Sequence, residues 1–323
     1  MKKTDVVALG ELLVDFTENG VSPQGNPVFE ANPGGAPCNV LAMLRKLDHT
    51  CAFIGKVGDD MFGKELRSVA ENAGISMEGL REDSQTRTTL AFVKTLEGGD
   101  RDFAFYRSPG ADMMLTPQEL PEELIRNARI FHFGTLSLTG EPVRSATRRA
   151  VELAKQAGAL ISVDPNLRES LWESTEDARE QILWSLGQCH MAKIADNELE
   201  FLTGETDFDR GAQEILQAFP NIQLLCITAG AGGSYAYCGN RRVFAPGFLL
   251  GGTIETTGAG DTFCACMLHH VLEQGLEDMS DAALLEMLRF ANAAAYLVTT
   301  KKGAIRSMPE RAQVEAILAD HPI

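Results

Sequence analysis

The feature that most constrains the fold of this chain is an alternation of short apolar runs with segments of helical apolar spacing. Residues 6–9, 52–54 and 130–133 are short apolar runs typical of buried strands. Apolar side chains recur every three or four residues over 40–47 and 62–73, which indicates helices that bury one face. Strands that alternate with helices predict βαβ units. We therefore expect an α/β fold with a mainly parallel sheet covered by helices on both faces.

The alternation continues to the C-terminal end. Three further apolar runs predict strands over 160–163, 191–194 and 224–227. The last third is mainly helical by spacing, over 263–271 and 284–298. No internal repeat, low-complexity segment or linker interrupts the pattern, so we expect a single domain over the whole chain, residues 1–323.

Two regions break the rhythm, because they contain strand-like pieces without a following helix. The first lies within residues 11–33, and the second within residues 88–110. In the second region, Glu97-Gly98-Gly99-Asp100 joins two apolar runs and is a hairpin signal. We expect these inserted segments to form a small antiparallel sheet beside the main one.

Composition excludes several classes of function. The chain has 29 Lys and Arg against 45 Asp and Glu, a formal net charge of −16, which is the wrong sign for gripping nucleic acid or an anionic membrane. No run approaches the 18 apolar residues of a membrane-spanning helix. The seven cysteines are odd in number, scattered and never spaced C-x-x-C, so a reducing, cytoplasmic location is expected.

The segment with the most chemical content is Glu255-Thr256-Thr257-Gly258-Ala259-Gly260-Asp261, which runs into a helix. Small residues let the backbone approach a ligand closely, and a helix start offers free N–H groups that bind anions. A carboxylate at that position, Asp261, is a candidate general base. The alternative interpretation is a glycine loop capped by Asp261, which stabilises the helix and does nothing more.

Three other segments are weaker candidates. Gly34 and Gly35 precede a helix that carries Asn39, whose amide both donates and accepts hydrogen bonds. The segment 164–168 follows a predicted strand, where open α/β sheets place their ligands. Glu200, in Asn197-Glu198-Leu199-Glu200, is a candidate for holding hydrated Mg²⁺. Each is also compatible with a plain turn or an acidic helix start.

Some familiar motifs are absent or incomplete. Gly58–Lys64 matches G-x-x-x-x-G-K, but Glu65 follows where a P-loop needs Ser or Thr to bind Mg²⁺. The six histidines include no H-E-x-x-H pair, so zinc-dependent hydrolysis has no support. A dehydrogenase is disfavoured because no G-x-G-x-x-G follows an early strand.

Taken together, the motifs resemble the ribokinase-like (PfkB) family of carbohydrate kinases over essentially the whole chain. The N-terminal signature corresponds to Gly34–Asn39 and the C-terminal one to Thr256–Phe263, in the expected order and at the expected separation. The Asn-x-x-Glu motif of the family matches Asn197 and Glu200. Within the family, three further segments look most like bacterial fructokinases: Arg107–Met113, Asp164–Arg168 with Leu171-Trp172, and Thr299–Ala304.

The resemblance implies a three-layer α/β/α domain with a small β-sheet lid, and transfer of the ATP γ-phosphate to a primary hydroxyl of a sugar, with fructose as first choice. It assigns the base to Asp261 and the anion hole to Gly258, Ala259 and Gly260. The implied sugar contacts are Asp15, Gly34, Gly35, Asn39, Arg107, Asn166 and Arg168. The implied nucleotide contacts are Lys193, Thr228, Gly230 and Asn292.

The resemblance also implies metal ions. Asn197 and Glu200 would hold Mg²⁺ through water, and Glu255 with Thr257 would line a site for a monovalent cation such as K⁺. Glu255 stands where the family usually has Asp, which leaves potassium activation open. Cys266 replaces a small Gly or Ala of the family in the following helix, where packing is the expected consequence.

Alternative functions remain open from the sequence. A 2-keto-3-deoxygluconate kinase would use Arg107 and Arg168 for the carboxylate of a sugar acid, for which bidentate Arg is well suited. A ribosyl-nucleoside kinase is a further alternative, as is a sugar-binding regulator without catalysis on the same fold. We expect a homodimer formed through the edges of the lid, because exposed antiparallel edges attract partners.

Overall fold

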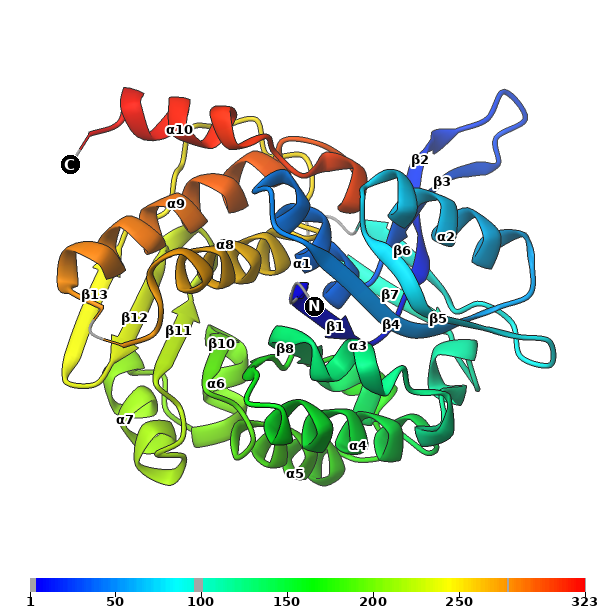
Figure 1. Ribbon diagram of the computed structural model, residues 1–323. Helices are drawn as coiled ribbons and strands as arrows, with labels where there is room; N and C mark the ends of the chain where they lie inside the picture. The colour runs from blue at the N-terminus through cyan, green and yellow to red at the C-terminus, as the bar shows by residue number, and fades with distance from the viewer. Residues whose placement is uncertain (1–3, 96–100, 278, 323) are drawn as a thin grey trace.

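The computed structural model describes residues 4–95, 101–277 and 279–322. A twisted sheet runs through the middle of the molecule, with helices above and below it (Figure 1). Within the described residues the sheet has nine strands in the order β13-β12-β11-β10-β9-β8-β1-β4-β5. The strands are β1 (Thr4–Leu9), β4 (Cys51–Gly58), β5 (Ser76–Asp83), β8 (Ala128–Gly134), β9 (Leu160–Asp164), β10 (Met191–Ala195), β11 (Leu224–Thr228), β12 (Ser234–Cys238) and β13 (Arg241–Ala245).

The sheet is buried on both faces, and alternate residues of one strand therefore enter different cores. In β1, Val6 and Ala8 pack into one core, and Val7 and Leu9 into the other. The first core is closed by α1 (Ala36–Lys46), α2 (Met61–Asn72), α8 (Ala259–Gln274), α9 (Asp281–Thr299) and α10 (Arg311–Asp320). The second is closed by α3 (Glu122–Arg126), α4 (Val143–Gln156), α5 (Thr175–Leu186), α6 (Asp196–Thr203) and α7 (Phe208–Ala218).

The predicted α/β architecture is confirmed, and each strand predicted for the main sheet lies within an observed one. The predicted helices match observed ones, except that Leu47 and Ala73 are the C-caps of α1 and α2 rather than part of them. The sequence did not predict β5, β12 or β13. The last two form an antiparallel hairpin that pairs with β11 at the edge of the sheet. Only a 3-10 turn, Gly230–Gly232, separates β11 from β12, so the rule that strands alternate with α-helices does not reach this edge.

A second sheet has the strand order β3-β2-β6-β7, and we call it the lid sheet. Its strands are β2 (Leu13–Val21), β3 (Pro27–Gly34), β6 (Leu90–Thr95) and β7 (Arg101–Tyr106). The expectation of an antiparallel sheet is wrong at its centre, where β2 and β6 pair in parallel. The predicted hairpin residues Glu97–Asp100 lie outside the described residues. The β2–β3 hairpin projects from the body of the molecule at the upper right of Figure 1.

Parallel pairing places the carboxyl ends of the central strands along one edge of the main sheet. Gly134 of β8 lies opposite Asp164 of β9, and Ala195 of β10 lies opposite Thr228 of β11. Such an edge is where open α/β sheets bind ligands. All seven cysteines are free and buried. Among the described helices, none has the length and apolar character needed to cross a membrane.

Candidate active site

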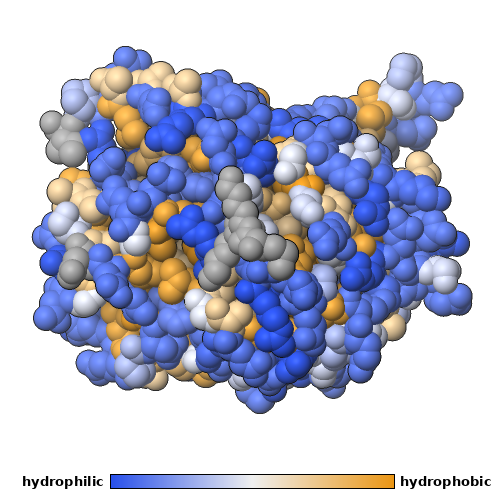
Figure 2. Space-filling view, in the orientation of Figure 1, coloured by the Kyte–Doolittle hydropathy of each residue, from blue (hydrophilic) through white to orange (hydrophobic). Residues whose placement is uncertain are grey.

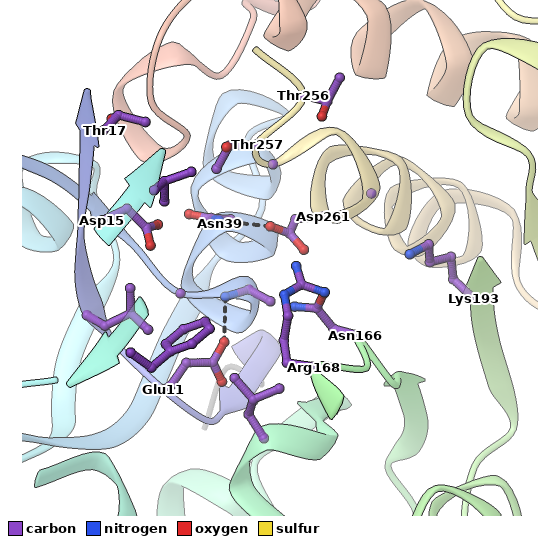
Figure 3. A pocket seen from close by; sticks show the side chains of 18 residues that line it. Glu11, Asp15, Thr17, Asn39, Asn166, Arg168, Lys193, Thr256, Thr257 and Asp261 are labelled. Atoms are coloured by element: carbon purple, nitrogen blue, oxygen red, sulfur yellow. Dashed lines mark hydrogen bonds between the residues drawn. The ribbon is translucent and has the colours of Figure 1, made fainter. Parts of the chain in front are cut away.

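A cavity of about 500 Å³ lies between the lid sheet, the carboxyl edge of the main sheet and the start of α8. Figure 3 shows polar side chains entering it from each of these parts, with Asp15 and Thr17 on the lid side and Asp261 opposite. The lining residues are Glu11, Leu13, Asp15, Thr17, Gly35, Ala36, Asn39, Val93, Phe105, Leu136, Asn166, Arg168, Lys193, Thr256, Thr257, Gly258, Gly260 and Asp261.

The hydrogen bond between Asn39 and Asp261 joins the first turns of α1 and α8. Asn39 Nδ2 donates to Asp261 Oδ2 over 2.8 Å, and the two residues are only 3% and 9% exposed. Burial and the nearby Asp164 raise the pKa of Asp261 to about 6, against the stabilising effects of Asn39, Lys193 and Arg168. A carboxylate with such a pKa is half ionised at mildly acidic pH and mostly ionised at neutral pH, which suits a general base.

A buried ion pair lies beside this carboxylate. Lys193 of β10 places Nζ at 3.2 Å from both carboxylate oxygens of Asp164, at the end of β9. Burial disfavours the charged form of Lys193, but Asp164, Glu198 and Asp261 outweigh it and raise the pKa of its ammonium group. A Cβ atom at Gly260 would lie 3.0 Å from Lys193 Nζ. The cation therefore lies directly against the first turn of α8.

The loop after β9 brings two more predicted residues to the cavity. Asn166 and Arg168 both line it, and Figure 3 shows Arg168 beneath Asp261. Asn166 has a φ of 50°, a left-handed backbone conformation that few residue types other than Gly and Asn adopt readily. The strained turn directs the loop toward the cavity rather than along the sheet edge.

Glycine is required where the backbone passes closest to other segments. Gly35 has a φ of 125°, and a Cβ there would lie 2.3 Å from the carbonyl oxygen of Glu11. Gly258, the N-cap of α8, has a φ of 78°. Gly34 lies beside Asp15, and a Cβ at this position would approach Asp15 Oδ2 to 2.6 Å. Small residues therefore let both helix starts reach the cavity.

A second cavity of about 250 Å³ meets the first at the start of α8, because Thr256 and Gly260 line both. Three of the four residues predicted to contact a nucleotide line it, namely Thr228, Gly230 and Asn292, whereas Lys193 lines the first. The other lining residues are Ala231, Gly233, Gly247, Phe248, Leu249, Thr253, Ala259, Phe263, Ala295, Tyr296 and Thr299. The second cavity is therefore the more apolar of the two.

The side chain of Asn292 forms hydrogen bonds to other residues of the protein. Its Oδ1 accepts from Ser234 Oγ over 2.9 Å, and its Nδ2 donates to the carbonyl oxygens of Ala245 and Pro246, each over 3.1 Å. It therefore holds the chain after β13 in place as a wall of the second cavity.

Comparison with known proteins identifies the family. Residues 3–311 match the pfkB family carbohydrate kinase description. The chain belongs to this family. A relative named Fructokinase-1, from Zea mays, is 44% identical over 313 residues, which cover 96% of each chain.

Two solved structures are also similar. A fructokinase with bound ATP from Xylella fastidiosa is 30% identical, with a TM-score of 0.89 and 99% of each chain covered. A double-mutant fructokinase from Vibrio cholerae O395, bound to fructose, ADP and a potassium ion, is 30% identical with a TM-score of 0.87. That match covers 98% of this chain and 99% of the other.

In this carbohydrate kinase, Arg107, a predicted sugar contact, forms its hydrogen bonds within the protein instead. Arg107 is not among the described residues that line the first cavity. Its guanidinium donates to Asp112 Oδ2 and Thr139 Oγ1, each over 2.8 Å, and to the carbonyl oxygen of Leu136 over 2.9 Å. Because Leu136 lines the cavity, Arg107 supports the cavity wall from behind.

The residues predicted to hold metal ions are also not gathered at the cavities. Asn197 and Glu200 are exposed, and neither lines either of the two cavities. The inward carboxylate of that turn is Glu198, which accepts N–H bonds from Leu167 and Ala195, each over 2.8 Å. Thr257 lines the first cavity, whereas Glu255 lines neither and donates its backbone N–H to Thr299.

The sequence analysis missed Glu11. Its side chain lines the first cavity and is 3% exposed, and its Oε1 accepts from the backbone N–H of Ala36 over 2.7 Å. Among the described residues no partner is seen for its Oε2. Burial raises the pKa of Glu11 to about 7. The available signal was an acidic residue directly after a buried strand, which is seldom placed in a core without a task.

Replacing Arg107 with Met should destabilise the fold rather than remove a sugar contact. The change leaves the buried carboxylate of Asp112 without its cation, so we expect the free energy of unfolding to fall by about 3–5 kcal/mol. Urea denaturation measures this. The control Arg126→Met removes an exposed pair with Glu122 and should change stability by less than about 1 kcal/mol. A normal stability with a raised KM for sugar would contradict the assignment.

Proposed function

We propose that this chain is an ATP-dependent fructokinase, which transfers the γ-phosphate to a primary hydroxyl of fructose to give fructose 6-phosphate. The observation that carries the proposal is the junction of two cavities at Thr256 and Gly260, with the buried carboxylate of Asp261 beside it. The polar cavity suits a sugar, and the more apolar one suits a nucleotide. The similarity to Fructokinase-1 of Zea mays supports fructose as the sugar.

The charges of the first cavity favour a neutral sugar over a sugar acid. Three carboxylates line it, those of Glu11, Asp15 and Asp261. Of the two arginines expected to grip the carboxylate of ketodeoxygluconate, only Arg168 lines the cavity. Lys193 also lines the cavity but is paired with Asp164, so a substrate carboxylate would meet these carboxylates without the pair of guanidinium groups that it needs. Hydroxyl groups, in contrast, donate readily to carboxylates.

The proposed reaction depends on positioning and charge stabilisation, because phosphoryl transfer needs little covalent help. Asp261 accepts the proton of the attacking hydroxyl, and Asn39 holds its carboxylate in place. The amides of Gly258, Ala259 and Gly260 at the helix start face the transferred phosphoryl oxygens. Ala259 already donates its N–H to the carbonyl oxygen of Thr256 over 3.2 Å, so its share of this task is the smallest.

On the nucleotide side, Thr228, Gly230 and Asn292 form walls of the second cavity, and Lys193 supplies a positive charge near the junction. We propose Mg²⁺ as the accompanying ion, which neutralises phosphate charge when bound. Glu198 has both oxygens engaged by backbone N–H groups, while Asn197 and Glu200 are exposed. Asn197, Glu198 and Glu200 are therefore compatible with a hydrated Mg²⁺ whose direct ligands are mainly phosphates and waters.

A monovalent cation near Thr257 is a further part of the proposal. The Vibrio cholerae fructokinase bound to a potassium ion supports it. Glu255 donates its backbone N–H to Thr299 and lies next to the segment that enters the cavity. Turnover compared in KCl and in tetramethylammonium chloride tests this part, and equal rates in both salts would contradict it.

An ATP-coupled assay tests the function. We expect turnover of fructose to exceed that of ketodeoxygluconate, ribose and nucleosides. A tenfold preference for any of these would contradict the fructose assignment. In the same assay Asp261→Asn should lower kcat by about 10²–10⁴-fold, the usual contribution of a general base. A folded Asp261→Asn variant with near-normal turnover would exclude Asp261 as the base.

The pH dependence of kcat/KM provides a sharper test of Asp261. The base must be ionised, and its pKa is raised to about 6, so activity should fall as the pH drops through that value. Asn39 donates to the carboxylate and favours its charged form, so Asn39→Ala should move the acid limb to higher pH. The exposed Asn72→Ala is the matched control. A limb that stays in place or moves to lower pH would refute the assignment.

We further propose that the lid sheet is part of the single kinase domain and pairs two copies into a homodimer. Both β3 and β7 are edge strands, and the projecting β2–β3 hairpin carries apolar residues on an otherwise mainly hydrophilic surface (Figure 2). Val21 and Tyr106 are 68% and 66% exposed. Light scattering should give twice the mass of one chain, and a purely monomeric sample would rule this out.

The free, buried cysteines support a cytoplasmic location, which stays a prediction.

A further inference from the structure

Helices α1 and α8 lie side by side near the centre of the molecule (Figure 1). Asn39 and Asp261 meet where the two helices begin. At the other end, His49, just after α1, meets His269 of α8, with His49 Nε2 at 2.6 Å from His269 Nδ1. Glu273 lies one helical turn beyond His269, on the same face of α8.

We propose that His49, His269 and Glu273 form a binding site for a divalent transition-metal ion of the zinc class, separate from the sugar and nucleotide cavities. One ligand atom from each residue lies within 4.8 Å of the other two. Two imidazoles and a carboxylate are a donor set that such ions prefer, whereas Mg²⁺ prefers oxygen ligands alone. Three protein ligands leave the fourth position of a tetrahedral ion to water.

The geometry needs only a small adjustment. Zinc–nitrogen bonds of about 2.0–2.1 Å at tetrahedral angles place two ligand nitrogens about 3.3 Å apart, so the imidazoles must separate by less than about 1 Å. His49 is held by its backbone, since its N–H donates to the carbonyl oxygen of Leu44 over 3.1 Å. The required separation therefore falls on the side-chain torsions of His49 and His269. Glu273 is exposed, so its carboxylate can turn toward the ion.

Both histidines have lone pairs available at neutral pH. Burial lowers the pKa of His49, and burial together with the neighbouring His49 lowers the pKa of His269 to about 4. In the metal-free pair one ring donates to the other. On binding, each ring keeps a single proton on its other nitrogen, so the ion takes the place of the shared hydrogen bond.

The charges around the pair also favour a cation. The negative charges of Asp5, Asp48 and Glu273 favour positive charge at His49. The opposing cations are Arg129 and Arg311, and His270 adds to their effect on His269. Each guanidinium is already neutralised by a carboxylate, Arg129 by Asp5 and Arg311 by Glu315, in both cases over 2.8 Å. Asp5 and Glu315 are committed to these arginines, so Asp48 and Glu273 are the acidic groups that remain to favour a cation.

Zinc titration of the nucleotide-free protein, after treatment with a chelator, tests the proposal. A chromophoric chelator reports the competition for Zn²⁺. We expect one high-affinity Zn²⁺ per chain, and at least tenfold weaker binding in Glu273→Gln and in His269→Gln. Two matched controls, Glu214→Gln on α7 and His321→Gln near the C-terminus, remove an exposed carboxylate and an exposed histidine away from the cluster and should bind like the wild type.

Two further measurements keep the outcome unambiguous. Circular dichroism without metal checks that each variant folds. If His269→Gln does not fold, the conclusion rests on Glu273→Gln, which should fold because Glu273 is exposed. The Co²⁺ form should show visible bands of nitrogen and oxygen ligation without thiolate charge transfer, which excludes the cysteines. Absence of stoichiometric Zn²⁺ binding, an unchanged affinity in Glu273→Gln, or equal weakening in the controls would overturn the proposal.

Discussion

The structure depends on a sheet that is buried on both faces. Parallel strands reach that state only when each returns through a helix, and the main-sheet strands β4, β5, β8, β9, β10 and β11 obey this constraint. A consequence is that the carboxyl ends of β9, β10 and β11 lie together, and with them Asp164, Lys193 and Thr228. The two cavities are thus a product of topology as much as of any single residue.

Within this frame, a small group of buried charges determines what the site can do. Asp261, Asp164 and Lys193 lie within one another's electrostatic reach, so the ionisation of Asp261 and of Lys193 depends on the neighbouring charges. The lysine is held charged by carboxylates, while Asp261 is kept close to half ionised at mildly acidic pH. A proton acceptor and a fixed positive charge therefore lie on opposite sides of the start of α8. This arrangement explains how an acidic chain handles a polyanionic phosphate donor without a basic surface patch.

The packing of α1 against α8 connects the end of the molecule that holds the first cavity with the cluster of His49, His269 and Glu273. One end of the pair carries the amide–carboxylate bond of Asn39 and Asp261, and the other carries the bond between His49 and His269. Both contacts are polar bonds between otherwise apolar helix faces. Each contact sets the register of the two helices, because an unpaired buried polar group at either end is costly.

The sequence by itself determined the alternation of strands and helices, and with it the layers, the edge that holds the site and the helix start that carries Asp261. Local spacing carries that information, since hydrophobic period and glycine content follow from a few neighbouring residues. Only the tertiary structure decided where long side chains go. It turned Arg107 toward Asp112, pointed Glu198 rather than Glu200 inward, and joined Asn39 to Asp261 across 222 residues. These choices depend on which partner lies within reach after the chain has folded, a property that no local pattern contains.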